Sequence, residues 1–209
     1  MYNPPAFVVS ERADILAMIR AAPLATFVTA TAEGPLATTL PLYLDADEGE
    51  HGTLYGHLAR ANDQWKAKPL GDGLAIFTGE EAYVTPSWYA AKQEHGKVVP
   101  TWNYEVVHAR GPVEFFEDAE RLKEVVTRLT DMHEAGRRNA WAVSDAPDAY
   151  IAAQLRGIIG LRMPITTLSA KRKMSQNRNA ADRAGVRLGL MAEDNLRAQT
   201  TASLIPQGD

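Results

Sequence analysis

The feature of this sequence that most constrains its fold is a succession of strand-like segments without regular crossover helices between them. Runs rich in β-branched and aromatic residues, bounded by Gly, Pro or polar turns, span residues 24–31, 35–44, 53–57, 73–78, 82–85, 104–117 and 158–169. Parallel strands need crossover connections, usually helices, whereas antiparallel strands can join through short turns. The succession therefore predicts a mainly β fold, an antiparallel barrel with peripheral helices packed outside it.

Helical patterns occur before, between and after these strand segments in the sequence. Ser10 is a typical N-cap, and apolar residues recur behind it at helical spacing until Pro23. Further helices are expected to begin at three capping or initiating residues: Asp118, Pro147 and Asn179. A short helix is expected over residues 60–68, before Pro69.

The chain length favours a single domain over residues 1–190. Residues 191–209 are then a helix end followed by a polar tail, which we expect to fray from Thr200. The N-terminus lacks the basic start and apolar run of a signal peptide, and no apolar stretch reaches the roughly 20 residues that span a bilayer. A cytoplasmic protein without membrane contact is the expectation.

Composition and motifs exclude several kinds of chemistry. Cysteine is absent, which excludes disulfides, thiolate nucleophiles and cysteine metal sites. The sequence has no P-loop, no dinucleotide-binding glycine motif, no nucleophile elbow and no zinc-protease motif. The five histidines lie far apart, so we expect no metal site.

The net charge of -4 is unusual for a dedicated DNA-binding domain, because phosphate neutralisation supplies much of the affinity of such domains. The charge is uneven, however. Residues 171–187 contain six basic residues and one acid. This stretch is either a solvated basic face or a site for a phosphate group.

Four segments are candidates for ligand contact. Ala37–Pro41 places two threonines and a proline within a strand, which is typical of an edge strand or of backbone facing a ligand. Gly56–Asn62 places His57, Arg60 and Asn62 at a strand exit, where free N–H groups favour anions. The alternative for this second segment is a loop with a surface ion pair.

The third candidate is a pair of aromatic stretches, and the fourth is a basic segment. Thr85–Tyr89 and Pro100–Tyr104 interleave aromatic residues with Pro, Ser, Thr and Asn, a combination that suits either a core anchor or a wall against a flat ligand. Lys171–Arg178 supplies cationic and amide donors, either for a phosphate, a carbonyl-rich ring or nucleic acid, or as an ordinary basic helix start.

Taken together and in this order, these segments resemble the PaiB-type family of FMN-binding negative transcriptional regulators. The matching stretches are Ala37–Pro41, GHLARANDQW at 56–65, YVTPSWY at 83–89, VPTWNYEVVH at 99–108, KMSQN at 173–177 and DRAGVRLGL at 182–190. The family is similar in fold to pyridoxine phosphate oxidases. The resemblance therefore implies an FMN-binding split β-barrel, six-stranded, antiparallel and of Greek-key type, that forms a homodimer in which each FMN touches both chains.

The resemblance also implies a set of cofactor-binding residues. Thr38, Thr39, Leu40 and Pro41 would lie along the isoalloxazine edge. His57, Arg60 and Asn62 would lie near the phosphate. Trp102 and Tyr104 would flank the ring from the partner chain, and Lys173, Ser175 and Gln176 would complete the pocket.

Two positions depart from the family pattern. Arg172 stands where the family usually has Trp, and Asp63 where it often has Pro. The loss of an aromatic ring beside Lys173 bears on that part of the pocket.

The function implied by the resemblance is a cytoplasmic, homodimeric flavoprotein that acts as a transcriptional repressor. The alternatives are a flavin-dependent oxidoreductase or flavin reductase, and a flavin-binding sensor without turnover. His57 and His108 are the available acid or base groups in the motifs, and the residues identify no catalytic residue. We expect Lys173 and Gln176 to face the cofactor, and Arg178, Arg183 and Arg187 to face solvent as the one surface able to contact DNA.

Overall fold

A computed structural model describes residues 1–208 and contains a single nine-stranded sheet among them. Its strands are β1 (Val8–Val9), β2 (Leu24–Thr31), β3 (Gly34–Asp45), β4 (Thr53–Ala59), β5 (Gly73–Val84), β6 (Thr101–Gly111), β7 (Glu114–Phe116), β8 (Ile158–Pro164) and β9 (Thr167–Lys173). They are hydrogen-bonded in the order β1-β9-β6-β5-β2-β3-β4-β8-β7. Every register that joins two of these strands in the described pairings is antiparallel.

The helices lie outside the strands. They are α1 (Arg12–Ala21), α2 (Ala91–Glu94), α3 (Ala119–Glu134), α4 (Asp148–Leu155), α5 (Ala180–Ala192) and α6 (Leu196–Ser203). Four 3-10 turns complete the structure: η1 (Pro5–Phe7), η2 (Asp63–Trp65), η3 (Pro86–Trp88) and η4 (Val143–Asp145). No helix in the described part of the chain is long and apolar enough to cross a bilayer.

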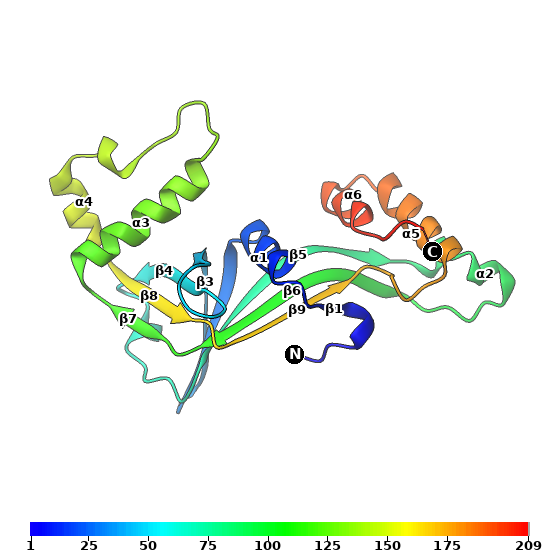
Figure 1. The fold of residues 1–209 in the computed structure, drawn as a ribbon, viewed down its shortest axis with the longest axis horizontal. Helices are drawn as coiled ribbons and strands as arrows, with labels where there is room; N and C mark the ends of the chain where they lie inside the picture. The colour runs from blue at the N-terminus through cyan, green and yellow to red at the C-terminus, as the bar shows by residue number, and fades with distance from the viewer. Residues whose placement is uncertain (209) are drawn as a thin grey trace. The chain divides into compact units, whose positions relative to one another are not determined.

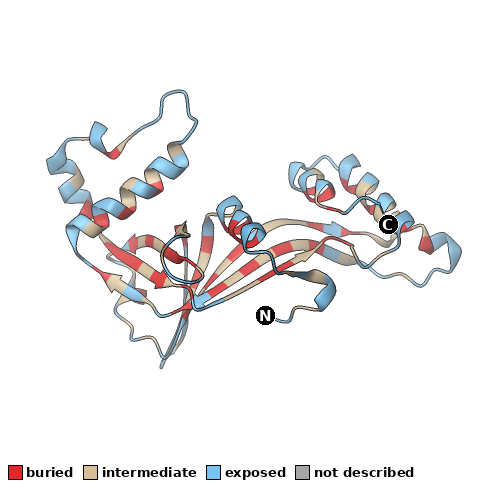
Figure 2. Cartoon of the chain, in the orientation of Figure 1, coloured by how far each residue is buried: buried red, intermediate tan, exposed pale blue. Residues whose placement is uncertain are grey.

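Contacts within the chain gather into two compact units. Unit 1 contains residues 1–18, 78–107 and the chain from residue 169 on, and unit 2 contains residues 19–77 and 108–168. The helices α3 and α4 belong to unit 2, and α5 and α6 to unit 1 (Figure 1). The long helices bury one face and expose the other, and burial alternates along the strands (Figure 2).

The core of unit 2 lies between α3 and the strands β3, β4 and β8. The α3 stripe Leu122, Val125 and Leu129 is buried with Tyr43 and Phe116. This stripe recurs at intervals of three and four residues, as expected for one helical face. Asp118 caps the helix as the sequence predicts, because its carboxylate accepts a hydrogen bond from the backbone N–H of Arg121 at 2.9 Å.

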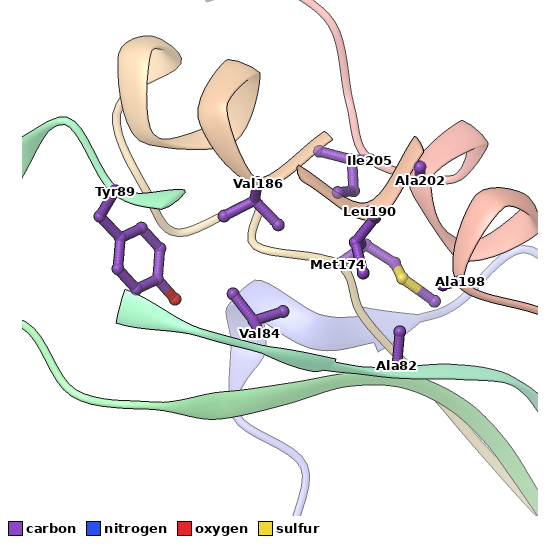
Figure 3. Packing of buried hydrophobic residues seen from close by; sticks show 9 residues of the cluster. All are labelled: Ala82, Val84, Tyr89, Met174, Val186, Leu190, Ala198, Ala202 and Ile205. Atoms are coloured by element: carbon purple, nitrogen blue, oxygen red, sulfur yellow. The ribbon is translucent and has the colours of Figure 1, made fainter. Parts of the chain in front are cut away.

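The core of unit 1 lies beneath α5 and α6. Val84 and Tyr89 pack with Val186 and Leu190 of α5, and Met174 is fully buried beside them (Figure 3). The N-terminal strand β1 is tied to the same unit, because Val8 pairs with Lys171 of β9. The last core contributor is the C-terminal helix, through Ala198 and Ala202.

The expected six-stranded Greek-key barrel is wrong in its strand number and closure. The sheet has nine strands, and β1 and β7 stand at its two ends. The segments 73–78 and 82–85 form one strand, since Gly79 allows β5 to pass over Glu105, whose Cβ would lie 3.0 Å from a Cβ at Gly79. Residues 104–117 divide into β6 and β7 where Pro112 offers no N–H to a ladder.

Two helical expectations also differ from the structure. Residues 60–68 form only the 3-10 turn η2. The polar tail, expected to fray from Thr200, instead continues α6 to Ser203, and Ile205 is buried. The reason is tertiary, because Ala198, Ala202 and Ile205 supply an apolar side to a segment whose local composition is polar.

Candidate functional site

A hydrogen-bonded cluster in unit 2 joins two of the expected cofactor residues, Thr38 and Asn62. Asn62 caps η2 by accepting from the N–H of Gln64 at 2.9 Å, and its amide donates to the Thr38 hydroxyl at 2.8 Å. The Thr38 hydroxyl donates in turn to Oε1 of Gln64 at 2.5 Å. The two side chains therefore already have local partners that hold the β3 edge against η2.

Gln64 is the centre of this cluster, and the sequence reasoning did not select it. Its side chain is buried, and its amide nitrogen donates to the Thr29 hydroxyl at 3.1 Å and the Leu36 carbonyl at 3.2 Å. The available signal was its place in the GHLARANDQW stretch, two residues after Asn62; only the structure shows that Gln64 is buried there. Gln64 positions the β3 edge.

The β3 edge itself contains Thr39, Leu40 and Pro41. Residues 34–41 pair with β2 on one side, whereas the pairing with β4 begins only at Leu42. Thr39 is exposed, while Leu40 is 3% exposed and belongs to the interior. Thr39 therefore offers its side chain to a ligand, and Leu40 offers only its backbone.

His57 lies on β4, immediately after Gly56, whose added Cβ would meet the Pro41 carbonyl oxygen at 2.9 Å. This close approach places the start of the His57 segment against the end of the β3 edge. The Nδ1 atom of His57 is buried and has no hydrogen-bond partner among the described residues. Burial lowers the pKa of His57, so its ring is neutral at pH 7. A buried ring nitrogen without a protein partner is available for a hydrogen bond to a ligand.

Arg60 follows β4 and is held from several sides. Its backbone N–H donates to the Gly157 carbonyl at 2.8 Å, and its Nε donates to the Arg156 carbonyl at 2.7 Å. Its guanidinium also forms an ion pair with Glu117. Arg60 lines a groove of about 420 Å³ along α3 and α4. A phosphate at Arg60 has to compete with the Glu117 carboxylate.

In unit 1, Trp102 and Tyr104 stand on β6. Trp102 is 52% exposed, and its ring meets Tyr83 edge-on with centroids 6.0 Å apart. Both rings line a groove of about 440 Å³ with Trp88. Tyr104 is half-buried, and the ammonium group of Lys171 lies 5.2 Å from its ring centroid.

The remaining expected cofactor residues lie at the end of β9, which is Lys173, or in the loop after it, which contains Ser175 and Gln176. The Lys173 ammonium donates to the Thr101 hydroxyl and to the Trp102 carbonyl. Ser175 is buried at φ 58° and donates to Oδ1 of Asn103 at 3.1 Å. The Gln176 side chain folds back onto its own loop, since its Oε1 accepts from the Met174 N–H at 2.6 Å. Its amide nitrogen donates to the Arg172 carbonyl, so both ends of the amide are bonded to backbone.

Arg172, the departure from the family pattern, has a partner of its own. Its Nε donates to Oε1 of Glu105 at 2.5 Å, and the Glu105 side chain is largely buried under Gly79. The arginine therefore completes a cross-strand ion pair on the sheet.

The arginines expected to face solvent do so only in part. The Arg178 guanidinium lies 4.7 Å from the centroid of the Tyr89 ring. Arg183 donates to the Arg178 carbonyl at 2.7 Å and also to the Gly208 carbonyl. Arg187 is half-buried. The expectation of a free arginine stripe is wrong for Arg178 and Arg183, because tertiary contacts occupy both groups.

The expected cofactor residues thus fall into two sets. Unit 2 holds Thr38, Thr39, Leu40, Pro41, His57, Arg60 and Asn62. Unit 1 holds Trp102, Tyr104, Lys173, Ser175 and Gln176. The described residues contain no group of three His, Asp or Glu side chains that could hold a metal ion.

The chain is similar in sequence to a known family and to a named bacterial protein. The family model "Putative FMN-binding domain" matches residues 1–167. The "Protease synthase and sporulation protein PAI 2" of Bacillus subtilis is 32% identical over 206 residues, which cover 98% of this chain and 96% of that protein.

Two solved structures share the fold. The flavocytochrome Anf3 from Azotobacter vinelandii superposes with a TM-score of 0.57 at 17% identity, covering 79% of this chain and 68% of that one. The FAD and heme binding protein from Mycobacterium smegmatis gives a TM-score of 0.55 at 15% identity, covering 79% and 73%. At these identities the likeness shows the fold alone. On the strength of the family model and the Bacillus relative, this chain belongs to the PaiB-type family of FMN-binding domains.

Proposed function

We propose that the protein binds FMN on the β3 edge of unit 2 and works as a homodimeric regulator of transcription. The observation that carries the flavin site is the buried, unpaired Nδ1 of His57 at the end of a strand edge that lacks a second strand partner. A flat ring with polar edges suits such a place, because it can accept or donate at the backbone and at the histidine together.

The residues present fit the flavin. Thr39 and the backbone of residues 39–41 would lie along the ring edge, and His57 would hold one polar ring atom. Thr38 and Asn62 would act through the Gln64 cluster, which keeps the edge in place. Arg60 would hold the phosphate after exchanging Glu117 for it. FMN, when bound, supplies one- or two-electron chemistry, which the protein orients and shields.

A second chain would complete the site. Trp102 and Tyr83 form an exposed aromatic pair, and large exposed aromatic surfaces are typical of interfaces. We propose that the partner's Trp102 and the partner's Tyr104 flank the flavin ring, as the family resemblance implies.

The regulatory role rests on the relatives rather than on a DNA-binding surface. The Bacillus relative is named as a protease synthase and sporulation protein. The net charge of -4 and the engaged arginines Arg178 and Arg183 oppose tight direct DNA binding. Regulation through another protein, with the flavin state as the signal, fits these observations better than direct repression.

The test is a visible absorption titration of the flavin-free protein with FMN. Wild type should shift and sharpen the flavin bands with a stoichiometry of one FMN per chain. His57→Gln should weaken FMN and riboflavin equally, by about tenfold, since a hydrogen bond to the ring is shared by both. His133→Gln, on the exposed surface of α3, is the control. Unchanged affinity in His57→Gln would remove the proposed site.

An electrophoretic shift with promoter DNA at increasing salt tests the regulatory mechanism. We expect no specific shift at physiological salt. A specific complex with a steep salt dependence would instead establish direct DNA contact.

A flavin-dependent oxidoreductase is the second candidate, and the aromatic groove of about 440 Å³ favours it. This groove offers Tyr83, Trp88 and Trp102 to a second flat substrate. Steady oxidation of NADH or NADPH by the FMN-loaded protein, lost in a Trp102→Ala protein that still holds FMN, would support this candidate over the regulator.

A further inference from the structure

A pocket of about 210 Å³ lies wholly within unit 1, between the start of β6 and the loop that follows β9. Lys173 and Arg178 line it, together with the polar side chains Asn103 and Ser175. Phe7, Val99 and Pro100 supply apolar wall. The pocket is therefore polar and basic at one part of its lining and apolar at another.

The positive charge of the pocket is not neutralised. None of the residues that line it is Asp or Glu. Lys173 contacts only a hydroxyl and a carbonyl in the described hydrogen bonds, and the Arg178 guanidinium lies over the Tyr89 ring. Burial, together with the nearby charges of Lys171 and Arg178, lowers the pKa of Lys173. Like charges crowded together in this way favour an anion.

A second, independent observation comes from Asn103. Its side chain is fully buried, and its Nδ2 has no hydrogen-bond partner among the described residues. Its Oδ1 is already occupied by the Ser175 hydroxyl, so the free end of the amide is a donor. Ser175 reaches this position through a left-handed backbone conformation, φ 58°, which a non-glycine residue adopts only at a cost. A buried donor without an acceptor is typical of a ligand site.

We propose that this pocket binds the phosphate group of a small phosphorylated ligand other than the flavin. Two cationic side chains and one buried amide donor complement a phosphate dianion better than a carboxylate, which carries one charge. The apolar wall suits the remainder of the ligand. The flavin site proposed above uses unit 2 of one chain with the partner's Trp102 and the partner's Tyr104. It uses neither Asn103 nor Arg178, so the two proposals can fail separately.

The family resemblance implies that Lys173 and Ser175 belong to the flavin pocket instead. The structure gives them a pocket shared with Asn103 and with Arg178, which the sequence predicts to face solvent. The two assignments differ in one measurable respect, namely whether the flavin's own phosphate occupies the pocket.

The experiment is isothermal titration with inorganic phosphate of three preparations: flavin-free, riboflavin-loaded and FMN-loaded protein. We expect one phosphate per chain that binds with the same affinity in all three; any second phosphate, bound at Arg60, would be lost when FMN is loaded. If FMN abolishes phosphate binding while riboflavin leaves it unchanged, the pocket holds the flavin's phosphate and the proposal is wrong. Failure of wild type to bind phosphate at millimolar concentration also overturns it.

Variants locate the binding. Lys173→Met and Arg178→Met should each weaken phosphate by about tenfold or more, because each removes a charge-assisted contact. Arg187→Met, on the same chain stretch but outside the pocket lining, should bind phosphate as wild type does. Equal affinity in all three variants would place the phosphate elsewhere and refute the assignment.

Asn103→Asp tests the same pocket with a variant that is expected to fold. The change keeps the size of the side chain and places a carboxylate where the free donor stood. Phosphate binding should fall at least tenfold while the far-ultraviolet circular dichroism spectrum stays that of wild type. Retention of wild-type phosphate affinity in a folded Asn103→Asp protein would contradict the proposal.

Discussion

At the scale of single residues, Arg60 shows how hydrogen bonds at the end of a strand can fix the position of a cationic side chain. Its backbone and Nε are bonded to the segment that begins β8, so the guanidinium is held rather than free. Glu117 then neutralises it. The side chain is about two-fifths exposed, which makes this ion pair weak enough to be exchanged for a phosphate.

Arg60→Ala should weaken FMN about ten- to a hundredfold and riboflavin little, because a charge-assisted contact to phosphate contributes roughly 1.5–3 kcal/mol. Fluorescence quenching of each flavin measures both affinities. Glu117→Gln is the matched variant, since it frees Arg60 from its competitor; it should bind FMN at least as tightly as wild type. Equal weakening of FMN and riboflavin by Arg60→Ala would show that Arg60 is not the phosphate contact.

At the scale of secondary structure elements, polar networks tie the strands of unit 2 to one another. Glu48 accepts from the Tyr55 hydroxyl at 2.6 Å and pairs with Arg162 of β8. Tyr55 also stacks on Tyr43 with ring centroids 5.2 Å apart. Burial alone raises the pKa of Glu48, but the hydrogen bonds and the charge of Arg162 outweigh it and hold that pKa below its ordinary value.

This lowered pKa predicts a pH-dependent contribution to stability. A carboxyl group whose pKa is lower in the folded state stabilises the protein above its unfolded pKa of about 4.3, and the contribution is lost as the pH falls through the folded value. Glu48→Gln should therefore lower the free energy of unfolding by about 1 kcal/mol at pH 7 and by less below pH 4. Urea denaturation at both pH values measures this. Glu50→Gln, whose side chain is 88% exposed, should leave the free energy unchanged at pH 7; a constant difference at all pH values would contradict the linkage.

The contact between α5 and η3 accounts for two of the sequence motifs together. The buried carboxylate of Asp182 accepts from the Ala91 N–H at 2.9 Å. Gly185 and Gly189, four residues apart on α5, face Trp88 of η3. An added Cβ at Gly185 would lie 2.0 Å from the Trp88 carbonyl oxygen. The YVTPSWY and DRAGVRLGL stretches therefore pack on each other.

Gly185→Ala should destabilise unit 1, because the obstacle is backbone and cannot rotate away. The overpacking costs roughly 1–3 kcal/mol, which exceeds the ~1 kcal/mol that alanine contributes in a helix. Thermal unfolding by circular dichroism measures the change. Gly71→Ala, where no atom lies within 4 Å of the new methyl group, is the control and should unfold at the wild-type temperature or above. An unchanged melting temperature in Gly185→Ala would mean that α5 does not dock closely on η3.

At the scale of the whole molecule, the two sets of expected cofactor residues belong to different compact units. The unit 2 set has polar groups for a ring edge and a phosphate but no aromatic ring, whereas the unit 1 set has Trp102 and Tyr104 together with three polar residues. In the proposed function, a second copy of the chain would supply the aromatic rings. Trp102 and Tyr83 are exposed and would form the contact with such a copy.

Sedimentation velocity should therefore give a dimer at micromolar concentration. Trp102→Glu should shift it toward monomer and weaken FMN in parallel, since the charge would be buried in the interface. Trp141→Glu is the matched control, because Trp141 is also exposed, at 45%, but lies in unit 2. A wild-type protein that sediments as a monomer would remove the two-chain flavin site.

The sequence by itself determined the local elements and the family. The helix caps Asp118 and Asn179 and most strands are visible in it, because capping and side-chain periodicity act over a few residues. Motifs in a fixed order identified the family for the same reason, since each motif is a local string.

Only the tertiary structure decided which groups are free to bind. Arg60 meets Glu117 across 57 residues, and Asn103 meets Ser175 across 72. Gln64 becomes the centre of a polar cluster only when β2 and β3 pair beside η2. Such contacts depend on which strands are neighbours and in which register, and local periodicity carries no information on either.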